Sequence, residues 1–200
     1  MQLKLLAMLL VIPAILARPA HAECPGQPPD VLPDKLYPVV KFETSMGAIE
    51  VELNRQRAPM TVNNFLRYVV AKRYDGTVFH RVIAGFVVQG GGYTPEWHEI
   101  PLFDPIINES GNGLMNDPYT IAMARFSDPN SATSQFYFNM AENQSLNPNA
   151  KNWGYAVFGS VVSGREVLDA IASVETGYND ALDAQDVPVK SVTLLHVTVE

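Results

Sequence analysis

Residues 79–92 read Phe-His-Arg-Val-Ile-Ala-Gly-Phe-Val-Val-Gln-Gly-Gly-Gly, two short apolar runs separated by an Ala-Gly pair. Apolar runs around a glycine-containing break predict a β-hairpin or a strand–turn–strand corner. Three side chains do not fit a plain apolar strand: His80, Arg81 and Gln89. Because side chains alternate between the two faces of a strand, Gln89 shares a face with Val87, and Arg81 can lie close to both on the neighbouring strand.

This placement has two interpretations. In the first, the hairpin brings a fixed cation, an amide and an apolar wall close together, as a binding site requires. In the second, Arg81 is a solvated side chain and Gln89 is a polar residue at the sheet margin. The spacing alone leaves both interpretations open.

The periodicity of the remaining chain predicts short strands and two helices. A helix opens at Ala58-Pro59 and carries an apolar stripe to about Lys72, which predicts that it plugs a β core. A second helix over 165–174 opens with a capping box, Ser163 to Glu166. Strands are expected over residues 37–44, 47–53, 120–124, 135–140, 156–162 and 191–199. Short strands with only two helices predict a mainly β fold, a closed and mostly antiparallel barrel.

Residues 1–22 differ in composition from the rest of the chain. Lys4 supplies a positive n-region, residues 5–16 are apolar apart from one proline, and Ala20-His21-Ala22 is a small-residue cleavage pattern. This combination predicts a secretory signal peptide, which is too short and wrongly flanked for a membrane span.

A short leader and one domain are expected to follow. Residues 23–35 contain four prolines and few apolar residues, which predicts an extended, loosely held leader. Residues 36–200, in a chain that is 47% hydrophobic, suffice for one core. Cys24 is the only cysteine, so we expect no internal disulfide. A lipid anchor on Cys24 is the alternative, although Glu23 stands where lipobox patterns have a small residue.

The charge of the chain disfavours two classes of partner. Removal of residues 1–22 takes away Lys4 and Arg18 and leaves 12 basic against 21 acidic residues, a net charge of −9. An acidic chain without basic clusters is a poor ligand for nucleic acid and for anionic lipid surfaces. We therefore expect no nucleic-acid partner and no membrane partner after signal removal. We also expect a monomer.

Three sequence blocks carry a family resemblance. They are residues 79–91, the run Ser-Gln-Phe-Tyr-Phe at 134–138, and residues 157–164, which read Val-Phe-Gly-Ser-Val-Val-Ser-Gly. In this order they resemble the signature of the cyclophilin family of peptidyl-prolyl cis–trans isomerases, and the resemblance covers roughly residues 37–200. It implies an eight-stranded antiparallel barrel capped by two helices, and an enzyme that rotates X–Pro bonds.

The resemblance also implies roles for individual residues. The positions that match the family's catalytic residues are Arg81, Gln89 and Phe86. The positions that match its substrate-binding residues are Val87, Ala124, Arg125, Gln135, Tyr137, Leu146 and Tyr155. By this likeness Arg81 acts on the twisted bond, Gln89 bonds the substrate backbone, and Leu146 is an apolar wall of the proline pocket. Ala124 and Arg125 match residues that hold the peptide before proline.

The chemistry of X–Pro rotation fits such a residue set. The barrier of about 18–20 kcal/mol is the loss of amide resonance on twisting. Catalysis therefore needs no nucleophile, acid–base pair, metal or cofactor, but a donor that prefers the twisted state with its pyramidal prolyl nitrogen. A guanidinium stays protonated and presents several N–H donors in a rigid fork.

Four positions depart from the family pattern. The common Met is Val87, the second Phe of the Gln-Phe-Phe run is Tyr137, and an active-site His is Tyr155. The hydroxyl of Tyr137 needs a partner or water. Ser145 stands where many members have the tryptophan that binds cyclosporin, so we expect weak inhibition by that ligand.

Other candidate sites are weaker. The glycines of 90–92 lack the Gly-Lys-Ser/Thr pattern of a phosphate cradle, and Trp97-His98-Glu99 offers only two adjacent metal ligands. His80 and His196 are expected to be core or near-core residues with hydrogen-bond partners. No Gly-x-Ser-x-Gly elbow supports a hydrolase. Sequons begin at Asn108 and Asn143, and they have meaning only in a glycosylating compartment.

The sequence therefore predicts a peptidyl-prolyl isomerase that assists the folding of exported proteins, with unfolded, proline-containing polypeptides as partners. The signal peptide and an end without a retention tail favour the bacterial periplasm. One alternative is a non-catalytic chaperone that binds proline peptides in the same groove without accelerating exchange. Another is a hollow β-barrel ligand carrier, which the many large apolar residues disfavour.

Overall fold

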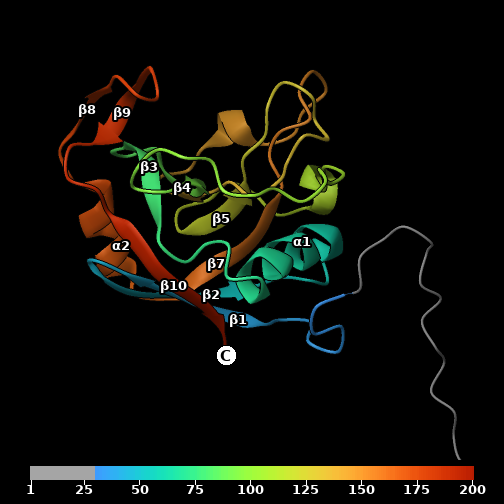
Figure 1. Ribbon diagram of the computed structural model, residues 1–200. Helices are drawn as coiled ribbons and strands as arrows, with labels where there is room; N and C mark the ends of the chain where they lie inside the picture. The colour runs from blue at the N-terminus through green and yellow to red at the C-terminus, as the bar shows by residue number, and fades with distance from the viewer. Residues whose placement is uncertain (1–29) are drawn as a thin grey trace, which may run out of the picture.

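The computed structural model describes residues 30–200 (Figure 1). The signal peptide expected at 1–22, Cys24 and the leader up to residue 29 lie outside the described residues. The barrel strands are β1 (Val39–Thr44), β2 (Gly47–Leu53), β3 (Thr77–Ile83), β4 (Val87–Tyr93), β5 (Thr120–Met123), β6 (Phe136–Asn139), β7 (Val157–Ser163) and β10 (Thr193–Val199). The helices are α1 (Pro59–Val70) and α2 (Arg165–Ala172), and two 3₁₀ turns are η1 (Ser110–Asn112) and η2 (Gln144–Leu146).

The predicted barrel is confirmed. Its eight strands close in the order β1-β10-β3-β4-β6-β5-β7-β2, and every neighbouring pair is antiparallel. The two helices lie on either side of it (Figure 1). Residues 79–92 lie in the β3–β4 hairpin, as predicted.

The barrel interior is filled with aromatic rings. Phe42 of β1 lies with its ring centroid 5.5–5.9 Å from those of Phe65, Phe136 and Phe138. Phe65 comes from α1, so this helix closes the barrel with its apolar stripe, as predicted. Because side chains occupy the interior, the hollow carrier is excluded for the described fold.

Two glycines of the run at 90–92 of β4, Gly90 and Gly91, allow the backbone to pass close to the aromatic rings of the core. Gly91 has a φ of +78°, and a Cβ there would lie 2.7 Å from the Cε1 atom of Phe136. Glycine is required at Gly91 because the backbone passes directly over the ring and adopts a left-handed conformation. The run is thus a corner of the barrel.

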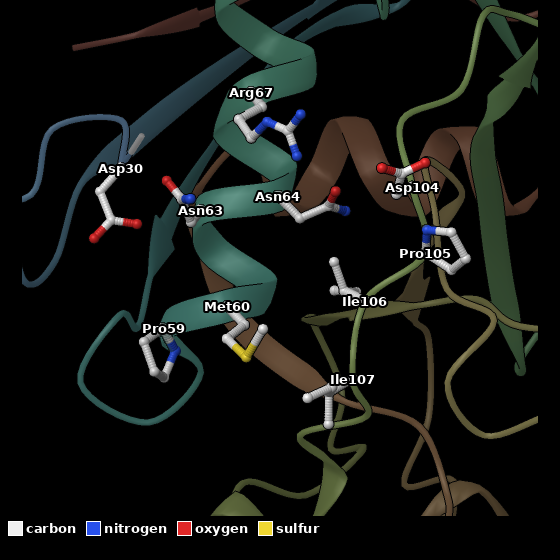
Figure 2. A pocket seen from close by; sticks show the side chains of 10 residues that line it. All are labelled: Asp30, Pro59, Met60, Asn63, Asn64, Arg67, Asp104, Pro105, Ile106 and Ile107. Carbon is white, nitrogen blue, oxygen red and sulfur yellow. The ribbon is translucent and has the colours of Figure 1, made fainter. Parts of the chain in front are cut away.

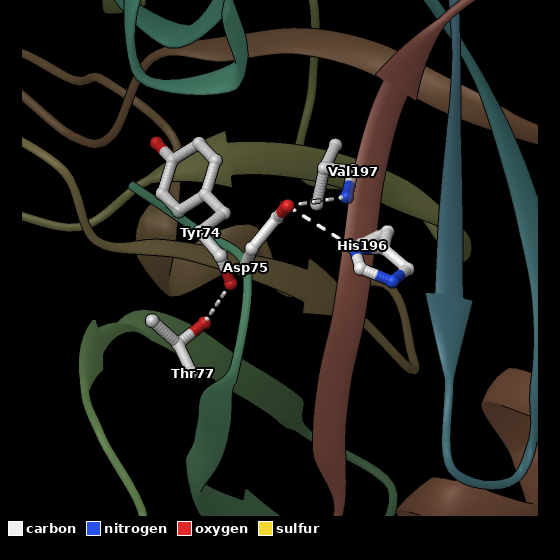
Figure 3. A network of polar contacts seen from close by, with 5 residues as sticks. All are labelled: Tyr74, Asp75, Thr77, His196 and Val197. Atoms are coloured by element: carbon white, nitrogen blue, oxygen red, sulfur yellow. Dashed lines mark hydrogen bonds and ion pairs between the residues drawn. The ribbon is translucent and has the colours of Figure 1, made fainter. Parts of the chain in front are cut away.

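The seam between β10 and β3 is closed by a side chain. The two strands pair over only two positions, Thr193 with Val78 and Leu194 with Thr77. Next to them, one carboxylate oxygen of Asp75 accepts the N–H of Val197 at 3.2 Å, and the other lies 3.1 Å from Nδ1 of His196 (Figure 3). Asp75 therefore extends a seam that has few backbone bonds.

The expectation that His196 lies in or near the core is wrong. Its side chain is 61% exposed and faces Asp75. The register of β1 against β10 shifts between Glu43 and Thr44, opposite the segment from Leu194 to His196. Such a bulge adds one residue to β10, so that Val197 turns inward in place of His196.

The capping box predicted for the second helix does not form. The N-cap of α2 is Gly164, which makes no side-chain cap bond and has a φ of +80°. Ser163 is the last residue of β7. A Cβ at Gly164 would lie 2.2 Å from the oxygen of Ala48, so close packing on β2 decides this helix start.

Two further segments differ from expectation. Strands β8 (Thr176–Asn179) and β9 (Ala184–Pro188) form a hairpin beside β3 (Figure 1) that the polar sequence did not predict. Residues 31–35 form a turn rather than an extended leader. Their backbone is bound because Arg55 donates from Nε to the oxygen of Lys35 at 3.1 Å and from Nη2 to that of Val31.

Candidate active site

One row of paired residues crosses five strands on the outside of the barrel. Arg81 of β3 pairs with Gln89 of β4, Gln89 with Tyr137 of β6, Tyr137 with Ala122 of β5, and Ala122 with Val157 of β7. Directly opposite residues of antiparallel strands point to the same face of a sheet. The row therefore forms one continuous surface, polar at the Arg81 end and apolar beyond it.

A β-bulge aims Arg81 onto this surface. Phe79 pairs with Gly90 and Arg81 with Gln89, so His80 is the extra residue of β3. Bulges redirect the side chains that follow them and are common beside functional sites. Here Phe79 packs into the core, His80 is buried, and Arg81 is half-buried at the surface row.

The apolar part of the row is a cluster separate from the barrel core. Its fully buried members are Val87, Ala122, Tyr137 and Val157, and its partly buried rim is Phe86, Leu114, Ala124, Leu146 and Tyr155. The structure thus brings together the six apolar positions singled out from the sequence. Ala122, Val157 and Leu114 were missed; Ala122 could have been found, because it shares a strand face with Ala124.

The cation and the amides form a hydrogen-bonded line. Nη1 of Arg81 donates to Oε1 of Gln89 at 3.4 Å, and Nε2 of Gln89 donates to Oε1 of Gln135 at 2.8 Å. The two salt bridges found within residues 30–200 lie elsewhere, at Lys41–Glu43 and Asp75–His196. Arg81 is therefore not neutralised by a carboxylate of the described chain.

His80 is neutral at physiological pH. It is 7% exposed, and its ring lies edge-on to that of Tyr93 with centroids 4.9 Å apart. Burial lowers the pKa of His80 to about 4, although Gln135 partly offsets the effect. Its Nδ1 is buried and lacks a hydrogen-bond partner among the described residues, whereas Gln135 is a hydrogen-bond partner of the ring. The expected near-core position therefore agrees with the structure, and the expected hydrogen bonding is met in part.

Arg125 turns its side chain toward the protein. Nε donates to the oxygen of Gly154 at 3.0 Å and Nη1 to that of Phe126 at 2.8 Å. Its guanidinium carbon lies 4.6 Å from the centroid of the Tyr155 ring, which packs edge-on against Tyr137. The side chain thus supports Tyr155 at the rim of the cluster.

The other candidate sites named from the sequence do not form a comparable cluster of side chains in the described residues. Both sequon asparagines are engaged, since Asn108 donates to the oxygen of Gly154 at 3.2 Å and Asn143 to that of Phe86 at 2.9 Å. In the part of the chain that the structure describes, no three His, Cys, Asp or Glu side chains gather as metal ligands. Nor does any helix of residues 30–200 have the length and apolarity to cross a membrane.

A hollow lies away from the row, between α1 and residues 104–107 (Figure 2). It is lined by Arg67 and Asp104 together with apolar side chains such as Met60, Ile106 and Ile107. Asn64, on the same helix face, is 1% exposed and donates to the oxygen of Thr133 at 2.6 Å. This hollow contains none of the row residues.

Comparison with known proteins identifies the family. The family model for the cyclophilin type peptidyl-prolyl cis-trans isomerases matches residues 39–199. A peptidyl-prolyl cis-trans isomerase of Streptomyces antibioticus is 52% identical over 158 residues, which cover 78% of this chain and 94% of the relative. The chain belongs to the cyclophilins.

Further relatives and solved structures agree. Peptidyl-prolyl cis-trans isomerase B of Escherichia coli is 44% identical over 164 residues, 80% of this chain and 99% of the relative. A crystal structure of a Cryptosporidium parvum cyclophilin superposes with a TM-score of 0.65 at 23% identity, covering 82% of this chain and 98% of that one. The protein is thus a cyclophilin-type peptidyl-prolyl cis–trans isomerase, and its barrel is the cyclophilin fold.

Proposed function

We propose that Arg81 accelerates X–Pro rotation by binding the twisted state of a peptide whose prolyl ring sits on the apolar cluster. The observation that carries this proposal is the position of the guanidinium. It stands at the polar end of the surface row, paired with Gln89, and no carboxylate of the described chain neutralises it.

The proposed action is selective for the transition state. In the planar ground state the prolyl nitrogen donates its lone pair to the carbonyl, so it is a poor acceptor. Twisting releases that lone pair, and a fixed N–H donor then gains a hydrogen bond that the ground state lacks. A donor that acts in this way lowers the barrier without tightening substrate binding.

Gln89 and the cluster hold the peptide in our proposal. Gln89 is oriented from two sides, by Arg81 and by Gln135, so its amide has a fixed direction toward a substrate backbone. Val87 and Tyr137 form an apolar floor for the prolyl ring, with Phe86 and Leu146 at its sides. Such preorganisation reduces the entropy lost on binding.

Replacement of Arg81 tests this mechanism. We expect Arg81→Ala to lower kcat/KM for an Ala-Pro peptide by about 10²–10³-fold, the loss typical of removing one preorganised donor. Arg81→Lys keeps the charge but not the planar fork, and we expect at least a ~10-fold loss. Arg165→Ala, which removes an exposed arginine on α2, is the matched control with unchanged kcat/KM. A folded Arg81→Ala protein with near-normal kcat/KM would remove Arg81 from the mechanism.

We also propose that the enzyme acts on exported proteins in a bacterial periplasm. The support is the composition of residues 1–22 and the bacterial origin of relatives such as those from Streptomyces antibioticus and Escherichia coli. Fractionation of producing cells followed by N-terminal sequencing tests this. The expected result is a periplasmic protein that begins at Glu23; an intact N-terminus in the cytoplasm would contradict it.

A further inference from the structure

The hydroxyl of Tyr137 is bound beneath the apolar cluster, which is the floor and wall of the proline pocket in our proposal. It donates to Oδ1 of Asn116 at 2.8 Å, and both residues are buried, Asn116 completely. The matching position of the family pattern is a phenylalanine, which has no such group. A buried hydroxyl is costly unless it has a partner, so this bond is the reason that the floor tolerates a tyrosine.

Asn116 also holds both ends of the turn that carries the pocket wall. Its backbone oxygen accepts the N–H of Asn143 at 2.9 Å. Its own N–H and its Nδ2 both donate to Oδ1 of Asn147, at 2.8 and 2.9 Å. Since η2 lies between these two asparagines, Leu146 stands on a turn that is bonded to Asn116 at each end.

A second chain of hydrogen bonds runs from Asn116 through two asparagines to the backbone of Phe86. Nδ2 of Asn139 donates to Oδ1 of Asn116 at 3.1 Å. Nδ2 of Asn143 donates to Oδ1 of Asn139 at 2.7 Å and to the backbone oxygen of Phe86 at 2.9 Å. The floor, the wall and one side of the pocket are therefore joined by a single buried network, whose members polarise and fix one another.

We infer that Asn116 is a positioning residue that sets the distance between the floor at Tyr137 and the wall at Leu146, and thereby the affinity for the prolyl ring. This inference rests on the proposed use of the pocket. Asn116 does not touch the substrate; it acts through Tyr137 and Asn147. A pocket shape that serves the planar and twisted states alike contributes to KM, whereas loss of Arg81 lowers kcat.

Two substitutions of Asn147 give the first test, because this residue is only half-buried and its Oδ1 is an acceptor for Asn116. Asn147→Ala removes two hydrogen bonds, and we expect KM for a proline tetrapeptide to rise about 5- to 10-fold with kcat within about 2-fold. Asn147→Asp keeps the acceptor, and its KM stays near that of the wild type. Equal KM values for the two variants would overturn the inference.

A double-mutant cycle gives the second test. Tyr137→Phe keeps the ring, and we expect a KM rise of about 3-fold, the effect of one net hydrogen bond. In an Asn116→Ala background the same change has no further effect, because the partner is already gone. If Asn116→Ala does not fold, Asn147→Ala serves as the background, and the two effects are then less than additive. Fully additive effects would contradict the network.

Asn64→Ala is the matched control, since Asn64 is an equally buried asparagine that lies on α1, outside the pocket. We expect this substitution to destabilise the fold and to leave KM unchanged. A KM rise as large as that of Asn147→Ala would contradict the inference, because general destabilisation of the fold would then explain the effect.

The proposal for Arg81 and the inference for Asn116 can be rejected independently of each other. A normal rate in Arg81→Ala with the KM effects above would reject the Arg81 mechanism and leave the role of Asn116 intact.

Discussion

Adjacent residues of β3 have opposite environments. Arg81 lies half-buried in the surface row, whereas His80 is enclosed beside Tyr93. The bulge at His80 separates the two, because it inserts one extra residue between Phe79 in the core and Arg81 in the surface row. In our proposal the fixed charge of Arg81 acts on the substrate, whereas the neutral imidazole of His80 is packed into the fold.

His80 makes stability depend on pH. Its pKa is about 4 in the folded protein, below the value of about 6.5 expected in the unfolded chain. As the pH falls below 6.5, the unfolded chain takes up a proton that the folded protein does not, so stability is lost until about pH 4. Between pH 6 and 5 we expect wild type to lose about 1 kcal/mol more unfolding free energy than His80→Gln.

Urea unfolding at each pH measures this difference. Carboxylates titrate in both proteins, so their contribution cancels in the comparison. Parallel curves for wild type and His80→Gln would mean that His80 is not neutral in the fold.

The sequence named the candidate site residues, but it did not reveal their surroundings. Arg81, Gln89 and the positions Phe86, Val87 and Tyr137 stand in the sequence blocks themselves, whereas Ala124, Leu146 and Tyr155 were named only by their match to family positions. The bulge does not, since residues 79–83 read as an uninterrupted strand. The partner of the Tyr137 hydroxyl could not be foreseen either, because Asn116 lies in an irregular segment with no periodicity.

At the level of elements, tertiary packing determines where a helix starts and where a strand forms when the local sequence does not. The start of α2 is set by the close approach of Gly164 to Ala48 and not by a capping side chain. The β8–β9 hairpin contains few apolar residues; its strand β9 contacts β3, and Val187 and Pro188 of β9 are buried. The start of α2 and the β8–β9 hairpin both depend on contacts between residues that are distant in sequence. Helix and strand propensities of the local sequence do not predict such contacts.

The β10–β3 seam leads to a prediction about stability. Asp75→Ala leaves the N–H of Val197 without its acceptor, and we expect a loss of about 1–2 kcal/mol. His196→Ala removes only an exposed ion pair, and we expect a loss of under about 0.5 kcal/mol. Denaturant unfolding at pH 7 compares the two variants. Equal losses would mean that the ion pair, and not the backbone bond, closes the seam.

At the level of the whole molecule, the barrel separates stability from function. Its interior is a packed aromatic core that includes Phe65 of α1, and its outer face carries a second, smaller cluster that receives the substrate in our proposal. The rigid interior fixes five strands in register, and the register fixes the row from Arg81 to Val157. In our proposal, this fixed register preorganises the row for binding the twisted state of the peptide.

Exchange NMR on an Ala-Pro peptide tests the central claim most directly, because it yields peptide affinity and the catalysed cis–trans rate in one sample. With Arg81→Ala we expect the affinity to change by less than about 3-fold and the exchange rate to fall by about 10²–10³-fold. A variant that binds the peptide as the wild type does and still exchanges it at the wild-type rate would contradict the account.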